Sequence, residues 1–483
     1  MPIYQQLATH YRESIEKGAL RPGTRMPSVR ELMLRHTVSL STALQSLRTL
    51  EEAGWVAARP RVGYFVCHVA HTHLQGWTEP DLRKPYAPAP TRFDGRYVGI
   101  NERISLLVES GRRADIKVDL GGATPGPGLF AVPAMNRDAA ALLREQPHIL
   151  VQGRSTAGTH PDFQAVMARR AVDAGVRLAP QDVLATSGNS EAVYLALAAV
   201  TQPGDVVAVE SPTYYGLLQA IESQGLSTLE IPCSQHTGIS LEALELAVRT
   251  EPRLKAVVVV PDLQMPLGTL MPDSHKAALA AFCSQHDLAL VEDDSYRLFV
   301  EAPTPPKPIK AWDKTGHVIY CESFNKTLAP GLRQGWMSAG RWHERVQMLK
   351  FAQSRNTQTL GQLLVARWVA SPAFGRHLLR LRPQLRSQRE RAAHAIVRYF
   401  PVGTRLRLPP GGLSLWVALP AGVSSAVLFR QGLQQGVRIA PGAMFSNTDR
   451  YDSFVRFGCV LPHSDEVNEA YRLLGGLIAK ACT

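Results

Sequence analysis

Residues 321–336 read CESFNKTLAPGLRQGW, and they follow an apolar run that is typical of a buried β-strand. Lys326 therefore lies at the exit of a predicted strand, with Ser323 three residues before it and Arg333 seven residues after it. A lysine amine can bind an aldehyde covalently, while a hydroxyl and a guanidinium can hold a phosphate. The spacing predicts a site for an aldehyde cofactor that carries a phosphate group, with Lys326 as the residue that binds it.

This segment resembles the cofactor-lysine motif of fold-type I pyridoxal-phosphate enzymes, the aminotransferase class I/II superfamily. The similarity extends from about residue 115 to the end of the chain. The resemblance implies that pyridoxal 5'-phosphate is the cofactor and that Lys326 is the catalytic residue. It also implies that Ser323 and Arg333 bind the cofactor phosphate.

A second motif, LALVEDDSY, ends another predicted strand upstream, and Asp293 and Tyr296 have the spacing of the same superfamily. An anionic Asp293 would keep the pyridine nitrogen of the cofactor protonated, while the Tyr296 hydroxyl would bond the ring oxygen. We expect the neighbouring Asp294 to be solvated. Both motifs place their polar residues at the carboxyl ends of strands, where parallel sheets gather ligand sites.

Three further segments supply the remaining contacts that the resemblance implies. In ESPTYYG an aromatic ring would stack on the pyridine, and either Tyr214 or Tyr215 takes that place. In VRFG, Arg456 would clamp the α-carboxylate of a substrate or effector. In TSGNSEAVYLAL a strand gives way to a helix, whose first N–H groups favour an anion. The phosphate contacts expected from this last segment are Gly188, Asn189 and Ser190.

Two positions depart from the pattern of an efficient enzyme. The superfamily segment N-P-x-G appears here as QMPLG, so Met265 replaces an Asn that would bond the ring oxygen. A thioether cannot donate that hydrogen bond. The segment around Gly153 also lacks a Tyr that relatives use to reach the cofactor phosphate of a partner subunit. We therefore expect cofactor binding to persist and transaminase activity to be weak or vestigial.

The chain around these motifs alternates short apolar runs with helical patterns, which predicts an α/β fold with a mostly parallel seven-stranded sheet. We assign residues 98–483 to this aminotransferase-like domain and about 385–483 to a small C-terminal α+β lobe, entered through a long helix at 377–400. The predicted strands are residues 183–186, 206–210, 227–231, 256–260, 288–292, 318–322 and 335–339.

Residues 1–68 have a different character, with three short helical patterns followed by a two-stranded ribbon. The second helix begins after Ser28, and Glu31 stands at the capping-box position three residues later. The third spans about residues 39–52, so the two helices form a helix-turn-helix. Residues 69–97 contain several prolines without sustained periodicity, which indicates a linker.

This N-terminal unit resembles the winged-helix DNA-binding domain of the GntR family, through RPGTRMPSVREL, TVSLSTALQSLRTLEEAGWV and GYFV. The resemblance implies binding to an operator in double-stranded DNA. Where many GntR members have Arg after the first Ser of the recognition helix, this chain has Leu40, so base preferences cannot be transferred. The alternative is a protein-interaction module. The DNA-contacting residues that the resemblance implies are Ser28, Arg30, Ser39, Ser41, Thr42, Arg59, Arg61 and Gly63.

Composition limits the other classes of function. The 483 residues carry a formal net charge of +12, which fits an anionic partner such as nucleic acid. The six cysteines are widely separated, so neither a zinc site nor a disulfide framework is expected, and no metal site is predicted. No segment approaches the length and apolarity of a membrane span. We therefore expect a cytoplasmic protein without a membrane partner.

A winged helix joined through a linker to an aminotransferase-like domain is the layout of the MocR-type regulators of the GntR family, which this chain resembles. The resemblance implies a homodimeric transcription regulator that holds pyridoxal phosphate and senses an amino compound or the cofactor itself. The first alternative is a working pyridoxal-phosphate-dependent aminotransferase with a DNA-binding appendage. The second is a binding module that has lost the cofactor and uses the fold only to dimerise.

Overall fold

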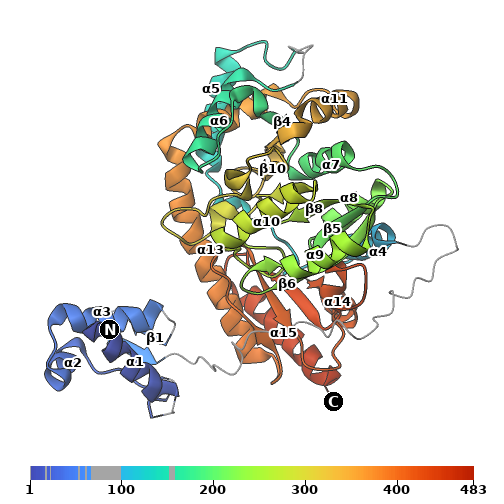
Figure 1. The fold of residues 1–483 in the computed structure, drawn as a ribbon. Helices are drawn as coiled ribbons and strands as arrows, with labels where there is room; N and C mark the ends of the chain where they lie inside the picture. Colours follow the sequence, from blue (N-terminus) through green and yellow to red (C-terminus); the bar gives the residue numbers. More distant parts are fainter. Residues whose placement is uncertain are drawn as a thin grey trace. The chain divides into compact units, whose positions relative to one another are not determined.

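The computed structural model describes residues 2–16, 19–21, 23–52, 55–59, 63–66, 99–151 and 158–482. Its contacts divide the chain into two units, Met1–Gln75 and Gly76–Thr483, each with a hydrophobic core of its own (Figure 1). The predicted linker, Gly153 and Arg61 lie outside the described residues.

The N-terminal unit packs three helices and a ribbon around Leu7, Leu32 and Leu47. Ser28 and Glu31 form the predicted capping box, because the Ser28 hydroxyl accepts the N–H of Glu31 and the Glu31 carboxylate accepts that of Ser28. The turn between the last two helices passes through a left-handed residue, Thr37. The elements are α1 (Ile3–Glu16), α2 (Val29–His36), α3 (Leu40–Glu52), β1 (Val56–Arg59) and β2 (Gly63–Val66).

The large unit is built on an eight-stranded sheet in the order β4-β11-β10-β9-β8-β5-β6-β7. All seven predicted strands are present, and β7 adds a short antiparallel edge to β6. β11 is antiparallel to both of its neighbours, while β10, β9, β8, β5 and β6 run parallel. The bounds are β4 (Leu184–Thr186), β5 (Val206–Ser211), β6 (Ser227–Ser234), β7 (Gly238–Ile239), β8 (Leu254–Val259), β9 (Ala289–Asp293), β10 (Val318–Ser323) and β11 (Gly335–Ser338).

Helices cover both faces of this sheet because alternate strand residues point to opposite sides. One face packs against α7 (Asn189–Val200) and α8 (Tyr215–Ser223), and the other packs against α9 (Leu241–Thr250) and α10 (Asp273–Gln285). Near β4 and β11, a further core includes α5 (Val132–Glu145), α6 (Pro161–Asp173) and α12 (Thr359–Val369). α11 (His343–Gln353) packs on α7.

Helix α4 (Ile100–Arg113) is the first described element after the predicted linker, and it packs on α8. Gly99 provides no side-chain cap for its first turn. Glu222 of α8 caps it instead, accepting the N–H of Ile100 at 3.1 Å, the N–H of Asn101 at 2.8 Å and the Asn101 amide at 2.6 Å. One carboxylate therefore anchors the start of α4.

The long helix α13 (Pro372–Tyr399) runs beside the sheet toward the C-terminal lobe (Figure 1). Its buried Arg389 donates to the carbonyl of Gly412 and pairs with Glu301, so the helix joins the lobes through charged contacts. The remaining elements are β3 (Val118–Asp119), β12 (Arg405–Leu406), β13 (Ser414–Ala418), α14 (Ser425–Gln434), β14 (Val437–Arg438), β15 (Ala440–Pro441), β16 (Phe454–Gly458) and α15 (Asp465–Ala481).

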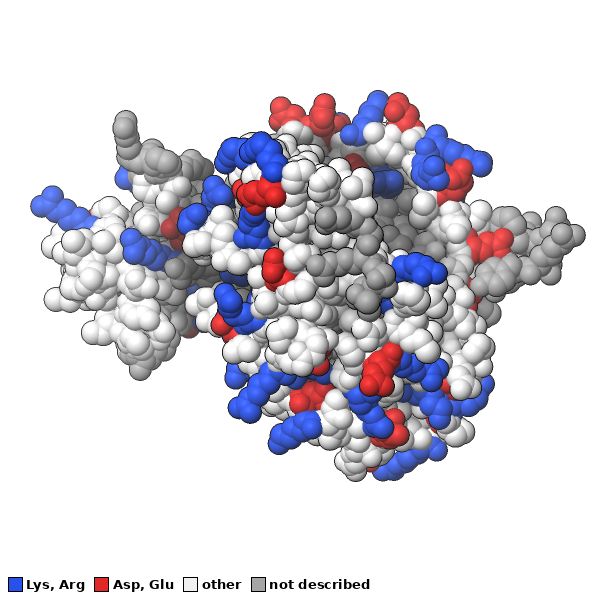
Figure 2. Space-filling model, turned by 90° about the horizontal axis from the view of Figure 1, so that it is seen from above, with Lys and Arg blue, Asp and Glu red and all other residues white. Residues whose placement is uncertain are grey.

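Charged side chains of both signs are mixed on the face of the molecule that Figure 2 presents, where Lys and Arg lie among Asp and Glu. Within the described ranges, no helix is both long and apolar enough to cross a membrane, and no group of three His, Cys, Asp or Glu residues is arranged to hold a metal ion.

Candidate cofactor and DNA sites

The central strands β9 and β10 bring the two sequence motifs together. They are parallel, and their register pairs Asp293 with Cys321, so both strands end at the same edge of the sheet. Tyr296 and Lys326 follow these strand ends, and the Lys326 amine lies 2.6 Å from the Tyr296 hydroxyl oxygen. The sheet topology therefore places residues from two distant sequence segments at one point.

Lys326 is a partly buried amine with few polar contacts. Besides Tyr296, it lies 3.4 Å from the carbonyl oxygen of Ala123. Burial and, after it, the nearby Arg456 cation lower the pKa of Lys326 to about 8, against the opposing effect of Asp293. A lowered pKa increases the fraction of neutral amine, which is the form that attacks an aldehyde.

Asp293 lies at the last position of β9, where its carboxylate accepts the N–H of Ser295 at 3.0 Å. Burial raises the pKa of Asp293, while its contact with Ser295 lowers it. Behind it, burial raises the pKa of Glu210 to about 8. A cationic ring nitrogen next to Asp293 would favour its ionised form, because an opposite charge offsets the cost of burial.

The amino end of α7 and the Arg333 guanidinium form a corner of hydrogen-bond donors, here called the anion corner. Gly188 is the N-cap of α7, with a φ of 86°, and supplies no side-chain cap. A Cβ at Gly188 would come within 2.7 Å of Asn325 Nδ2 and 3.2 Å of Arg333 Nη2, so a larger residue would have to displace one of these side chains and would be strained by the positive φ. The Arg333 guanidinium also donates to the carbonyl of Ser187. The unpaired N–H groups of the helix and the adjacent guanidinium suit a phosphate.

A cavity of about 270 Å³ lies between these groups. The Asn189 side-chain oxygen is buried without a hydrogen-bond partner among the described residues, although its amide donates to Ser295. The acid, the amine and the anion corner around this cavity fit pyridoxal 5'-phosphate. The predicted cofactor residues that line it are Asn189, Ser190, Tyr214, Asp293, Tyr296, Ser323, Lys326 and Arg333, with Gly188 at its edge.

Arg456 approaches the site from β16 and is only 5% exposed. Its guanidinium donates to the carbonyl of Gly121 and lies 3.8 Å from the Met265 sulfur, and its Nε has no partner among the described residues. No described carboxylate pairs with it. A buried cation without an anionic partner is costly, so this position suits an anionic ligand.

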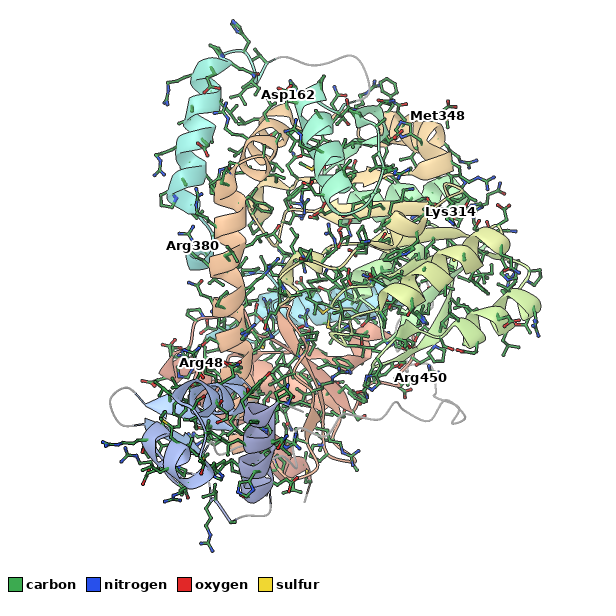
Figure 3. The ribbon with its side chains drawn as sticks, turned by 60° about the vertical axis from the view of Figure 1, so that its left-hand side comes forward. Arg48, Asp162, Lys314, Met348, Arg380 and Arg450 are labelled. Atoms are coloured by element: carbon green, nitrogen blue, oxygen red, sulfur yellow. The ribbon has the colours of Figure 1, made fainter. Side chains whose placement is uncertain are left out.

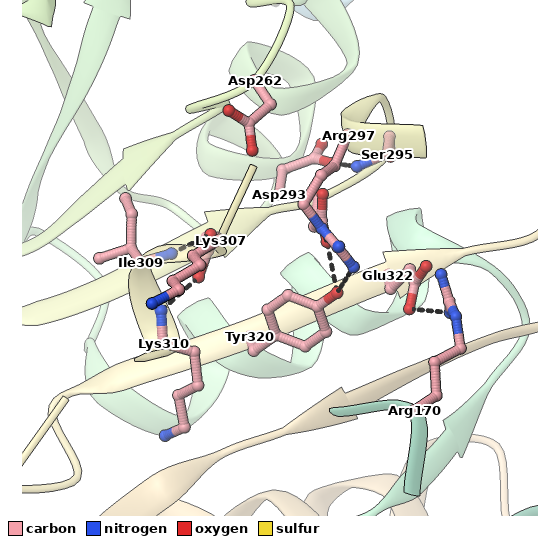
Figure 4. A network of polar contacts seen from close by, with 12 residues as sticks. Arg170, Asp262, Asp293, Ser295, Arg297, Lys307, Ile309, Lys310, Tyr320 and Glu322 are labelled. Carbon is pink, nitrogen blue, oxygen red and sulfur yellow. Dashed lines mark hydrogen bonds and ion pairs between the residues drawn. The ribbon is translucent and has the colours of Figure 1, made fainter. Parts of the chain in front are cut away.

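The structure contradicts one expectation about the neighbouring acid. Asp294 is buried rather than solvated: it comes directly after β9 and pairs with the equally buried Arg297 at 2.6 Å. Tyr320 also donates to Asp294. Figure 4 shows the side chains of Arg297 and Tyr320 turned toward each other in this network. No sequence pattern indicates this network, because its partners lie on separate strands and turns.

The predicted DNA-contacting hydroxyls lie at helix starts, where they also shape the backbone. The Ser39 hydroxyl accepts the N–H of Thr42 at 3.2 Å and lies 2.9 Å from the hydroxyls of both Ser41 and Thr42. These three residues, like Ser28, therefore stabilise the start of a helix whether or not DNA is bound.

Three further features bear on the DNA interface. Arg30 is exposed, and Leu40 is 55% exposed at the first position of α3. Gly63 has a φ of 120°, pairs with Arg59 in the register of β1 and β2, and lies beside the Arg25 side chain. The side chain of Arg59, like Arg61, lies outside the described residues.

Some residues around Lys326 were not found from the sequence. Asn325 and Ser295 also line the cofactor cavity. The sequence signal that could have found them is their position beside the motif residues Lys326 and Asp293. A second cavity includes residues 121–124, Arg438 and part of α4. These segments carry no motif, and only the folded chain brings them beside Lys326.

Comparison with known proteins finds a separate family match for the N-terminal unit and for the large unit. Residues 145–472 match the family Aminotransferase class I and II, and residues 3–66 match Bacterial regulatory proteins, gntR family. The uncharacterized HTH-type transcriptional regulator YjiR of Escherichia coli K12 is 35% identical over 100% of both chains. YdcR, an uncharacterized HTH-type transcriptional regulator of the same organism, is 34% identical over 99% of both chains.

A solved structure shares the fold of the large unit. It is that of LysN, the α-aminoadipate aminotransferase of Thermus thermophilus, complexed with N-(5'-phosphopyridoxyl)-L-leucine. It is 29% identical, with a TM-score of 0.69, and the match covers 78% of this chain and 95% of LysN.

The chain therefore belongs to the aminotransferase class I and II family, with the fold-type I architecture, and its cofactor is pyridoxal 5'-phosphate. The gntR-family domain at its start and the full-length regulators that it resembles define it further. It is a DNA-binding transcription regulator of the MocR type.

Proposed function

We propose that this regulator senses an amino compound through pyridoxal phosphate held at Lys326, and that the bound ligand changes its affinity for an operator. The observation that supports the proposal is the Lys326 amine, whose pKa is lowered and which is influenced by both Asp293 and Arg456. Arg456 has no carboxylate partner among the described residues. Coupling requires that the ligand bind two arrangements of the protein with different affinities. The alternative effector is the cofactor itself.

Each side chain has a distinct role in this proposal. The cofactor supplies an aldehyde and an electron-withdrawing ring. Lys326 would hold the aldehyde carbon, Asp293 would bind the protonated ring nitrogen, and Tyr296 would hydrogen-bond the ring oxygen. Arg456 would bind the carboxylate of an incoming amino acid. The phosphate would rest on the amino end of α7 and on Ser190, Ser323 and Arg333, and Tyr214 would stack on the ring.

The same proposal includes a homodimer that reads paired half-sites. A winged helix places one recognition helix in one major groove, so two copies read two half-sites that lie about one helical turn or a multiple of it apart. The predicted contacts are Ser28, Arg30, Ser39, Ser41, Thr42, Arg59, Arg61 and Gly63. Sedimentation of the full chain would test the dimer, and footprinting would test the paired sites.

Absorbance spectroscopy tests the cofactor part of the proposal. The full chain loaded with pyridoxal phosphate should show a band at roughly 400–430 nm, which is a property of the lysine-bound cofactor. Lys326→Ala should lose the band, while the control Lys314→Ala, at an exposed lysine labelled in Figure 3, should keep it. A band that survives in Lys326→Ala would contradict the assignment. No band in either protein would favour the module that has lost its cofactor.

The second candidate function is a working aminotransferase with a DNA-binding appendage. The convergence of Lys326, Asp293, Tyr296 and Arg456 around one site favours it. Met265 opposes it, because its sulfur cannot donate a hydrogen bond to the ring oxygen. Steady production of a keto acid from an amino acid would support this candidate, whereas amino-acid-dependent retardation of operator DNA without such turnover would support the sensor.

A further inference from the structure

A second cavity, of about 340 Å³, adjoins the cofactor cavity at Lys326 and Tyr296. Arg456 lies in its wall together with Tyr214 and Tyr215. A ligand whose amine meets the cofactor and whose carboxylate meets Arg456 would therefore direct the rest of its structure into this cavity. The chemistry of the remaining walls decides which ligands fit.

The wall of the second cavity contains a group of apolar side chains beside its polar ones. Leu107 and Val108 of α4 form one wall, and Phe429 and Met444 contribute from the C-terminal lobe. Phe429 and Met444 are buried, while Val108 is 46% exposed. No Asp or Glu is among the described residues that line this cavity. An apolar group that enters it would gain the free energy of leaving water.

A further cation in the wall, Arg438, is already paired. The parallel strands β3 and β14 place Asp119 directly opposite Arg438, and the two side chains form a two-pronged ion pair. The Arg438 Nε lies 2.9 Å from Asp119 Oδ1, which also accepts the N–H of Gly121 at 2.9 Å. Asp119 thus neutralises the guanidinium and is itself held by a turn.

We propose that the effector is an α-amino acid with an apolar, uncharged side chain, and that Asp119 excludes dicarboxylic amino acids by occupying Arg438. This inference rests on the proposed sensor function. A second ligand carboxylate would have to displace Asp119 from Arg438, and would then meet the displaced negative charge in a partly buried site. An aliphatic side chain meets Leu107, Val108, Phe429 and Met444 without that penalty.

Calorimetric titration of the full chain loaded with pyridoxal phosphate tests the ligand class. L-leucine should bind at least about tenfold more tightly than L-glutamate, since burial of aliphatic carbons and avoidance of a displaced charge act in the same direction. The amine-free pair 4-methylpentanoate and glutarate should keep this order, because the discrimination lies in the side-chain cavity. That pair makes the measurement independent of chemistry at the cofactor.

Variants of the ion pair test the role of Asp119. Asp119→Asn keeps an oxygen for the N–H of Gly121 but frees Arg438, so glutamate and glutarate affinity should rise roughly tenfold while leucine affinity changes little. Arg438→Gln should leave leucine binding almost unchanged. In the double variant Asp119→Asn/Arg438→Gln, the gain in glutamate affinity should disappear, because the freed cation is absent.

The outcomes separate this inference from the proposed function. A wild-type preference for glutamate and glutarate, or no gain in Asp119→Asn, would overturn the inference while leaving an amino-acid sensor in place. The absence of binding by every amino acid and every carboxylate would overturn the sensor function, and the inference with it. Tighter binding of leucine than of glutamate, a gain in glutamate affinity in Asp119→Asn and the loss of that gain in the double variant would together support the inference and the sensor function.

Discussion

At the scale of single residues, Lys326 shows how the environment prepares a common side chain for covalent chemistry. Its ordinary pKa of 10.5 falls to about 8, first through burial and then through the Arg456 cation. A base with a lowered pKa is charged below that value and neutral above it. The rate at which the apoprotein captures pyridoxal phosphate should therefore rise as the pH increases through about 8.

Stopped-flow absorbance over a range of pH values measures this rate. Arg456→Gln removes the neighbouring positive charge, so the midpoint of the profile should move to higher pH. A midpoint near the ordinary lysine value in the wild type, or no movement in Arg456→Gln, would show that these surroundings do not act on the amine.

Met265 is the residue that most distinguishes this site from an efficient enzyme. It is 3% exposed, and its sulfur accepts a contact from the Ser414 hydroxyl at 3.7 Å. Met265→Asn supplies the missing hydrogen-bond donor, so conversion of the bound cofactor to its amine form by L-leucine should accelerate by about tenfold or more in a single turnover. Met265→Leu keeps the volume without a donor and should show no gain. Equal rates in both variants would contradict this interpretation of the site.

At the scale of elements, the prediction concerns the start of α7. Gly188→Ala would force a Cβ toward Asn325 and Arg333, and pyridoxal phosphate affinity should fall at least about tenfold as the anion corner closes. Gly204→Ala is a matched control, because its φ of 93° is similar but no atom lies within 4 Å of the added carbon. Gly188→Ala also carries backbone strain of about 1–3 kcal/mol, because a φ of 86° with a ψ of −178° is a conformation that essentially only glycine adopts.

Fluorescence titration with the cofactor, together with thermal unfolding, separates strain from the local effect. Both variants should lose stability, and only Gly188→Ala should lose cofactor affinity. Equal cofactor affinity in the two variants would show that the corner does not hold the phosphate.

The elements that could be predicted are those with a strong local signal. Strands such as β5 and β8 are buried over most of their length, so they appear as apolar runs in the sequence. The motifs at the ends of β9 and β10 place Asp293 and Lys326 together. The two-residue strands β3, β7 and β14 have no periodicity to detect. Asp119 and Arg438, which pair across β3 and β14, are far apart in sequence, so only the folded chain shows their contact.

At the scale of the whole molecule, the DNA prediction compares two exposed arginines on different units. Arg30 lies in the first turn of α2, and Arg380 lies on α13, where it is labelled in Figure 3. Arg30→Ala should weaken operator binding and reduce the slope of log affinity against log salt by about 2, because the proposed homodimer loses one phosphate contact in each subunit. Arg380→Ala should change neither quantity.

Electrophoretic retardation of the upstream DNA at several salt concentrations measures both effects. An unchanged slope in Arg30→Ala would mean that the contact surface lies elsewhere on the N-terminal unit. A loss of affinity in Arg380→Ala would assign a second DNA surface to the long helix.

The anchoring of α4 by Glu222 has a mechanical consequence. The helix is held at its first turn, while Leu107 and Val108, two turns later, face the ligand cavity. A ligand side chain that presses against those residues would tilt α4 about its first turn, which Glu222 holds in place. Because the predicted linker comes directly before α4 in the sequence, α4 is the described helix of the large unit that lies nearest along the chain to the operator-reading domain.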